Sequence, residues 1–235
     1  MLETAMSSLA PRRVMIEVSE TQRVSALLLA PAKPRAAYAF AHGAGAGMEH
    51  AFMSAVAEGL AEREVATLRF QFPYMENGSR RPDPPTIAQA TVRAAVERAG
   101  REWPDTPLFA GGKSFGGRMT SQAQSASPLT STRGLIFVGF PLHPAGKPST
   151  DRAKHLAEVR VPMLFLQGTR DELATLSLLE PTVRQLGHHT TLHLIPEADH
   201  AFHVPARTGR KDADVRQELL DTMTAWMCTV AAGRE

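Results

Sequence analysis

Short apolar runs, many of them rich in β-branched or aromatic residues, alternate along this chain with longer amphipathic runs. The short runs predict strands at residues 14–18, 24–29, 36–41, 65–70, 108–110, 134–140, 163–167 and 191–195. The long runs predict helices at residues 50–63, 86–98, 115–125, 175–186 and 213–230. Such alternation is typical of an α/β fold, in which a parallel sheet is covered by helices on both faces.

The length of the chain, 235 residues, allows about seven tenths of the unfolded surface to be buried on folding. Proline-rich stretches at residues 82–85 and 141–148 interrupt the alternation only briefly. Because strands and helices resume directly after each stretch, we interpret both as loops over one face and not as linkers. The sequence therefore predicts one domain over residues 1–235.

Composition argues against several classes of function. No run approaches the roughly eighteen apolar residues that a membrane-spanning helix needs. The 26 basic residues are interspersed with 24 acidic ones, so the chain has no basic stripe to follow a nucleic-acid backbone. Cys228 is the only cysteine, and residues 1–13 lack the apolar core of a signal peptide. We therefore expect a cytoplasmic protein that binds neither nucleic acid nor membrane.

The most informative motif is Gly-x-Ser-x-Gly at residues 112–116, which lies between a predicted strand and a predicted helix. In that context the serine occupies a strained corner, and the flanking glycines let strand and helix approach closely. The hydroxyl of Ser114 then lies at a helix N-terminus, where the dipole favours the negative charge of acyl transfer. The alternative is a glycine-rich turn whose serine only caps the helix.

Two nucleotide-binding motifs overlap with these glycines. Gly112, Lys113 and Ser114 also match the end of a phosphate-binding P-loop, but Pro107 occupies the position where that loop needs glycine. Residues 43–47 resemble a dinucleotide-binding loop but lack its third glycine at the required spacing. We therefore expect no nucleotide cofactor.

A second glycine-rich turn, at residues 42–45, follows the predicted strand at residues 36–41. In enzymes with the serine motif, this position carries a loop whose amide binds the oxyanion. The sequence predicts Ala44 as that donor, with Gly43 or Gly45 as alternatives. The residue after the nucleophile, Phe115, supplies the second amide.

A serine nucleophile needs a base and an acid, which in the fold that this motif indicates follow it in the order acid, then histidine. Asp171 follows the predicted strand at residues 163–167, and His200 follows the last predicted strand. Both therefore fall at the same end of the sheet as Ser114. Glu172 is an alternative acid and His203 an alternative base, whereas Asp199 is adjacent to His200 and poorly placed to hold its ring.

Histidine and carboxylate residues near residue 200 also raise the possibility of a metal site. His200, His203 and Asp199 are suitable zinc ligands by type, but their spacing matches no metal-binding motif. We therefore expect neither a metal nor another cofactor.

Taken together, these motifs resemble the small, nearly lidless α/β-hydrolases related to dienelactone hydrolases. The narrower resemblance is to bacterial predicted hydrolases that share a domain with the testis-expressed and NSL-complex-subunit hydrolase-like proteins of animals. It is carried by residues 42–45 (HGAG), 70–76 (FQFPYME), 111–118 (GGKSFGGR), 141–148 (PLHPAGKP) and 166–171 (LQGTRD). It implies an eight-stranded, mostly parallel sheet and a catalytic triad of Ser114, Asp171 and His200.

The sequence thus predicts a serine hydrolase that cleaves a small soluble ester or thioester through an acyl-enzyme on Ser114. Amidase or peptidase activity uses the same groups and stays open.

Residues 141–162 leave little room for a lid, so we expect a shallow pocket. Its predicted substrate-binding residues are Tyr74, Lys113, Arg118 and His143. The cations among these and neighbouring loop residues favour an anionic acyl group. The competing hypothesis is an inactive relative that acts as a binding or scaffold module.

Overall fold

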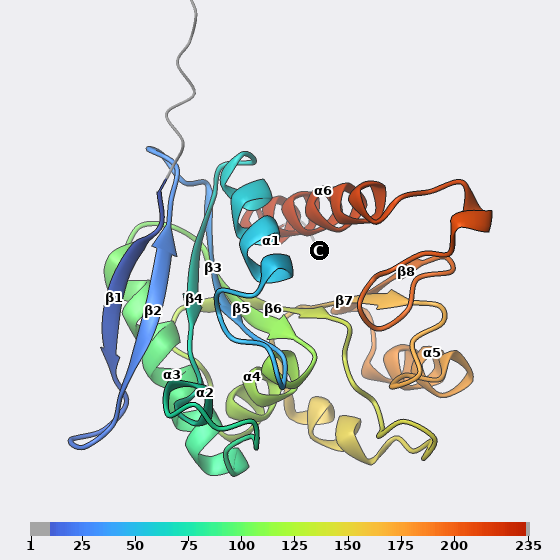
Figure 1. The fold of residues 1–235 in the computed structure, drawn as a ribbon, viewed down its shortest axis with the longest axis horizontal. Helices are drawn as coiled ribbons and strands as arrows, with labels where there is room; N and C mark the ends of the chain where they lie inside the picture. The colour runs from blue at the N-terminus through green and yellow to red at the C-terminus, as the bar shows by residue number, and fades with distance from the viewer. Residues whose placement is uncertain (1–9, 234–235) are drawn as a thin grey trace, which may run out of the picture.

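A computed structural model of the chain describes residues 10–233 and contains an eight-stranded sheet (Figure 1). The strands are β1 (Arg12–Glu17), β2 (Arg23–Leu29), β3 (Ala36–Ala41), β4 (Val65–Phe70), β5 (Leu108–Lys113), β6 (Thr132–Val138), β7 (Met163–Gly168) and β8 (Thr190–Ile195). Their spatial order is β1-β2-β4-β3-β5-β6-β7-β8. Strand β2 pairs antiparallel with β1 and β4, and the remaining neighbours are parallel. The predicted α/β architecture with a mostly parallel sheet is confirmed.

Helices cover both faces of the sheet (Figure 1). They are α1 (Ala51–Ala61), α2 (Pro73–Glu76), α3 (Pro85–Glu102), α4 (Phe115–Ala126), α5 (Leu176–Leu186) and α6 (Asp212–Ala231), with 3₁₀ turns η1 (Asp151–Glu158) and η2 (Ala206–Thr208). Helices α1 and α6 pack on one face, and α3 and α4 pack on the other. Among residues 10–233, no helix is both long and apolar enough to cross a membrane.

The central strands are buried on both sides, as parallel strands between two helical layers must be. In β3, Tyr38 and Phe40 belong to the cluster under α1 and α6, whereas Ala37 and Ala39 belong to the cluster under α3 and α4. This alternation follows the two-residue period of a strand. Small residues on one side and aromatic rings on the other therefore set how closely each helical layer approaches.

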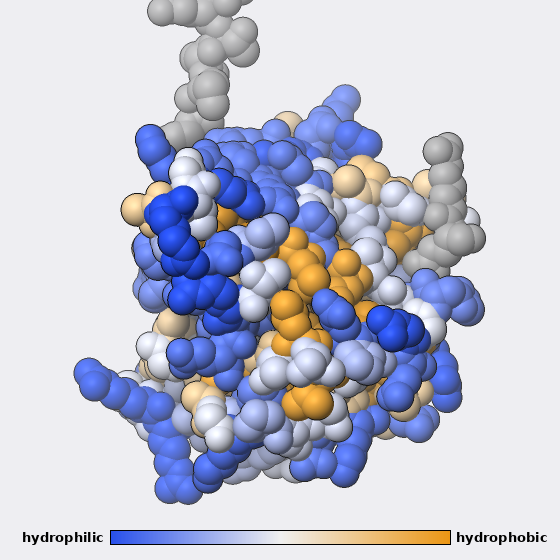
Figure 2. Space-filling view, turned by 90° about the vertical axis from the view of Figure 1, so that its right-hand side faces the viewer, coloured by the Kyte–Doolittle hydropathy of each residue, from blue (hydrophilic) through white to orange (hydrophobic). Residues whose placement is uncertain are grey.

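The end of the sheet at β8 differs from this double-covered centre. In the described part of the chain, β8 pairs only with β7, and Leu192 and Leu194 are only partly buried. Seen from this side, the surface shows a hydrophobic patch framed by hydrophilic residues (Figure 2).

The predicted C-terminal ends of β5 and β6 are wrong by three and two residues, and glycine explains both. Strand β5 continues to Lys113 instead of ending at Ala110, because Gly111 and Gly112 remain in register with β6. Strand β6 ends at Val138 instead of residue 140, because Gly139 has a φ of +72°, which no strand residue adopts. Residues 141–162 form a loop and η1 and carry no inserted lid.

Candidate active site

The corner between β5 and α4 holds Ser114 in a backbone conformation that is rare for a residue with a side chain. Its φ is +50° and its ψ −113°, while its amide donates to the carbonyl of Val138 at 3.1 Å. A Cβ atom at Gly116 would lie 2.6 Å from the carbonyl oxygens of both Ala41 and His42. Glycine is therefore required for α4 to begin this close to β3, and the tight corner presents the serine hydroxyl at the carboxyl end of the sheet.

The hydroxyl of Ser114 lies 2.8 Å from Nε2 of His200. The other ring nitrogen, Nδ1, lies 2.6 Å from Oδ2 of Asp171. Asp171 occupies the turn after β7 and His200 the loop after β8, so parallel strands bring all three groups to one end of the sheet. With the proton on Nδ1, the imidazole donates to the carboxylate and accepts from the hydroxyl.

The carboxylate of Asp171 has no exposed side-chain surface. Besides His200, it accepts hydrogen bonds from Nε2 of Gln167 and, at 2.8 Å, from the amide of Leu173. Gln167 is itself fully buried, and its Oε1 accepts from the amide of Phe140 at 2.9 Å. The sequence analysis did not assign Gln167 a role, although a polar residue at the end of the apolar strand β7 was a signal for one.

The other acids and the other base that the sequence analysis considered make contacts away from Ser114. His203 pairs with Asp212 at 2.9 Å, and this carboxylate raises the pKa of the imidazole. Oδ1 of Asp199 accepts from the amides of Ala201 and His203 and so folds the loop around His200. Glu172 is exposed at the surface. The described structure brings none of the three into hydrogen-bond contact with Ser114.

The oxyanion side of the site is built on His42, which is completely buried. Its Nδ1 lies 2.8 Å from the carbonyl oxygen of Gly43, and its Nε2 accepts from the amide of Phe72 at 3.1 Å. Burial lowers the pKa of this imidazole to about 4, so it is neutral at pH 7. His42 therefore fixes the turn whose next amide is that of Ala44.

Both amides that the sequence predicts as oxyanion donors are unpaired in the described part of the chain. Among residues 10–233, the amides of Ala44 and Phe115 are paired with no protein acceptor. Gly43, one of the alternatives to Ala44, is packed against the serine, since a Cβ atom there would lie 3.7 Å from that of Ser114. The order of the turn and its free amides suit the predicted oxyanion role, which stays a prediction.

The ring of Phe115 contacts an aromatic wall. Its centroid lies 5.3 Å from that of Phe72 and 6.4 Å from that of Tyr74. Tyr74 is only 3% exposed, and burial raises the pKa of its phenol. The structure thus places this predicted substrate-binding residue in the interior, next to the ring of Phe115.

Lys113, another predicted substrate-binding residue, points to the histidine loop. Its Nζ donates to the backbone carbonyl of His200 at 2.6 Å and lies 5.4 Å from the ring centre of Phe202. Burial lowers the pKa of this ammonium to about 8. The residue before the nucleophile therefore connects the serine corner to the loop that carries the base.

His143 and Arg118 complete the set of predicted substrate contacts. His143 is 1% exposed, and both of its ring nitrogens have partners, in Pro144 and Thr175. It joins the loop after β6 to the start of α5. Arg118 lies on the first turn of α4 with its guanidinium carbon 5.9 Å from the ring centre of Phe115. Contact of these residues with substrate stays a prediction.

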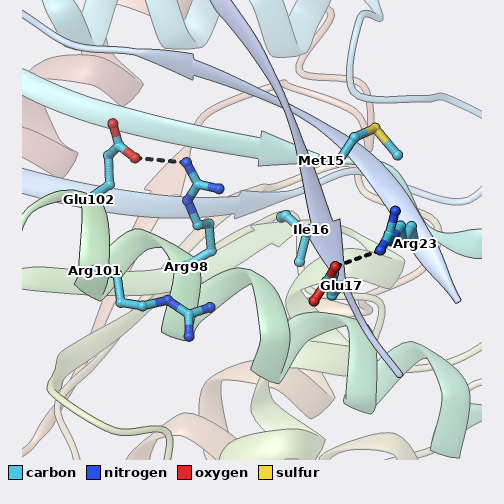
Figure 3. A pocket seen from close by; sticks show the side chains of 7 residues that line it. All are labelled: Met15, Ile16, Glu17, Arg23, Arg98, Arg101 and Glu102. Carbon is cyan, nitrogen blue, oxygen red and sulfur yellow. Dashed lines mark hydrogen bonds and ion pairs between the residues drawn. The ribbon is translucent and has the colours of Figure 1, made fainter. Parts of the chain in front are cut away.

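A cavity of about 600 Å³ lies on the other side of the molecule, between β1, β2 and α3. Its walls carry two ion pairs, Arg98 with Glu102 and Arg23 with Glu17 (Figure 3). We call it the β1-side cavity; it is lined by Met15, Ile16, Glu17, Arg23, Arg98, Arg101 and Glu102. None of these side chains is a serine, cysteine or histidine, and both carboxylates are held in ion pairs with arginines. A second cavity, of about 540 Å³, borders His200.

Comparison with known proteins agrees with this geometry. The fold is similar to that of a dienelactone hydrolase from Anabaena variabilis, with a TM-score of 0.75, 20% identity and coverage of 94% of this chain and 98% of that one. It is also similar to a lidless α/β serine hydrolase from Xanthomonas campestris, with a TM-score of 0.71, 21% identity and coverage of 92% and 94%. The sequence of residues 34–228 matches the family described as "Alpha/beta hydrolase domain". The chain belongs to this α/β hydrolase family.

Proposed function

We propose that this protein is a serine hydrolase that cleaves a small ester or thioester through an acyl-enzyme on Ser114. The observation that carries the proposal is the continuous hydrogen-bonded chain from the Ser114 hydroxyl through His200 to the buried Asp171. The similarity of the protein's fold to those of a dienelactone hydrolase and a lidless serine hydrolase supports ester chemistry. Kinship with the bacterial hydrolases that resemble testis-expressed and NSL-complex subunits is part of the same proposal.

In the proposed mechanism, Oγ of Ser114 attacks the substrate carbonyl while Nε2 of His200 takes its proton. Asp171 stabilises the resulting imidazolium, and the amides of Phe115 and Ala44 bind the oxyanion. The imidazolium then gives its proton to the departing alcohol or thiol. Water, deprotonated by the same histidine, attacks the acyl-serine and releases the acid.

Labelling with a fluorophosphonate probe tests this function directly, because the probe reacts with activated serines. We expect wild-type protein to be labelled and Ser114→Ala to be inert. Ser127→Ala is the matched control, since it removes an exposed hydroxyl just after the end of the same helix. Unlabelled wild-type protein that hydrolyses no p-nitrophenyl ester would overturn the proposal and favour the scaffold hypothesis. Matched p-nitroanilides distinguish an esterase from an amidase.

A further inference from the structure

Arg118 and Arg152 lie on two neighbouring elements, and the first of these elements begins directly after the nucleophile. Arg118 is four residues after Ser114, one helical turn away, and its amide donates to the carbonyl of Ser114 at 3.1 Å. Arg152 lies on η1, which packs against α4 through a 2.8 Å hydrogen bond between Ser121 and His155. We call Arg118 and Arg152 the arginine pair.

In the described part of the chain, the arginine pair has no counter-ion. Within residues 10–233, neither guanidinium takes part in a salt bridge or donates a side-chain hydrogen bond, and Nε of Arg118 is buried without a partner. Burial lowers the pKa of Arg118, and the charge of Arg152 lowers it further. A partly buried guanidinium without a carboxylate partner is costly, and an anion bound at its Nη groups offsets part of that cost.

Nearby ionisable groups leave this charge uncompensated. The carboxylate of Asp151 pairs with Lys154 at 2.6 Å, and that of Glu158 with Arg160 at 3.6 Å. His155 adds no charge at pH 7, since burial and the charge of Arg118 lower its pKa to about 4. The arginine pair is therefore a local concentration of positive charge beside the serine corner.

The position of the pair indicates which part of a substrate would meet it. Arg118 lies against the ring of Phe115, whose amide is the proposed oxyanion donor. His200 approaches Ser114 from the loop after β8 and delivers its proton to the leaving group. In this proposal the leaving group is directed toward His200, and the acyl chain toward Phe115 and Arg118.

We propose that the arginine pair binds a carboxylate on the acyl portion of the substrate, so that the preferred substrates are half-esters or half-thioesters of short dicarboxylic acids. This inference rests on the proposed hydrolase function. A carboxylate can accept hydrogen bonds from the Nη groups of the Arg118 guanidinium, and Arg152 adds long-range attraction. The substrate carboxylate thereby supplies the counter-charge that the described part of the protein does not.

The test compares mono-p-nitrophenyl glutarate with its methyl ester, which has the same acyl length without the charge. We expect wild-type kcat/KM to be about tenfold higher for the charged ester, and Arg118→Gln or Arg152→Gln to abolish this ratio. Arg101→Gln, which removes an exposed cation of the β1-side cavity, should keep the ratio. The ratio should also fall as salt is added.

Binding without turnover separates this inference from the proposed function. Isothermal titration of Ser114→Ala with monomethyl glutarate should show binding that dimethyl glutarate does not, and adding Arg118→Gln should abolish it. Such binding, together with a wild-type protein that hydrolyses no ester, supports the anion site and overturns the hydrolase. Equal kcat/KM for the two esters in an active wild-type enzyme, or an unchanged ratio in both arginine variants, overturns the anion site and leaves the hydrolase intact.

Discussion

The β1-side cavity and the arginine pair both place arginines beside apolar surface, but they treat the charge differently. In the cavity, Arg98 and Arg23 pair with Glu102 and Glu17 at 3.0 and 2.8 Å (Figure 3). Beside the serine corner, Arg118 has a buried Nε and no carboxylate partner in the described part of the chain. Paired or solvent-exposed charge is compensated without a ligand, whereas an unpaired, partly buried charge is stabilised by a bound anion. Cavity volume alone therefore does not identify the functional side of this molecule.

The serine corner and the region of the β1-side cavity also differ in backbone strain and in how tightly the backbone is packed. Ser114 is held at positive φ between glycines that allow close backbone contact. Gly100, in α3 below β1, has ordinary space around it, since the nearest atom to a Cβ there would be 3.9 Å away. Strain and close packing are thus concentrated where the proposed chemistry occurs. Substitutions on the two sides should consequently have unequal effects.

The largest expected effect is that of Asp171→Asn. An amide there donates to Nδ1 of His200, which forces the proton onto Nε2 and prevents the ring from accepting from Ser114. We expect kcat for a p-nitrophenyl ester to fall about 10⁴-fold, with some loss of stability because the new NH₂ group faces the Nε2 donor of Gln167. Asp105→Asn, at an exposed position before β5, serves as the control. A loss of less than tenfold in the folded Asp171 variant would show that this carboxylate does not orient the base.

The next effect concerns stability in acid. Because the pKa of His42 is about 4 when folded and 6.5 in the free side chain, the unfolded chain binds more protons between these values. The contribution of neutral His42 to the free energy of unfolding is therefore complete above pH 6.5 and is lost as the pH falls toward 4. It amounts to about 3 kcal/mol in all, of which about 2 kcal/mol is lost between pH 7 and 5.

Urea unfolding of wild-type protein and of His42→Gln at pH 7 and 5 measures this contribution. The variant should be less stable at pH 7 and should lose less free energy of unfolding than wild type between the two pH values. His188→Gln, which removes an exposed imidazole, should behave as wild type. An identical pH dependence in wild type and His42→Gln would contradict a buried, neutral His42.

Glycine substitutions compare the packing of the two sides. Gly116→Ala places a methyl group against the carbonyl oxygens of Ala41 and His42, and we expect it to cost about 2 kcal/mol of unfolding free energy. Gly100→Ala fills open space in a helix and should add about 0.5 kcal/mol. Denaturant titration measures both values. Equal effects at the two positions would refute the difference in packing between them.

The smallest expected effect is that of Lys113→Met. Losing the hydrogen bond from Nζ to the carbonyl of His200 loosens the loop that carries the base, so kcat should fall about tenfold while KM changes little. A rise in KM at constant kcat would instead indicate that Lys113 contacts substrate, as the sequence analysis predicted. Steady-state kinetics with one p-nitrophenyl ester distinguish the two outcomes.

Local sequence signals predicted the fold and the grouping of Ser114, Asp171 and His200. Each of these residues follows a strand, and the carboxyl ends of parallel strands meet at one end of the sheet. The partners of Gln167 and Lys113 could not be predicted, because each hydrogen bond joins segments whose distance depends on loop conformation. The lack of a carboxylate partner for Arg118 in the described structure could not be predicted either, since the sequence does not show which carboxylates lie within reach of its guanidinium.

The central claim is that Ser114 carries an acyl group during turnover. Mixing the protein with p-nitrophenyl pivalate, whose hindered acyl group slows deacylation, and quenching in acid should trap this intermediate. Peptide mass spectrometry is predicted to find pivalate on the peptide that contains Ser114, with about one equivalent of p-nitrophenolate released in the initial burst. Sustained release of p-nitrophenolate with Ser114 unmodified, or with the acyl group on another residue, would contradict the account.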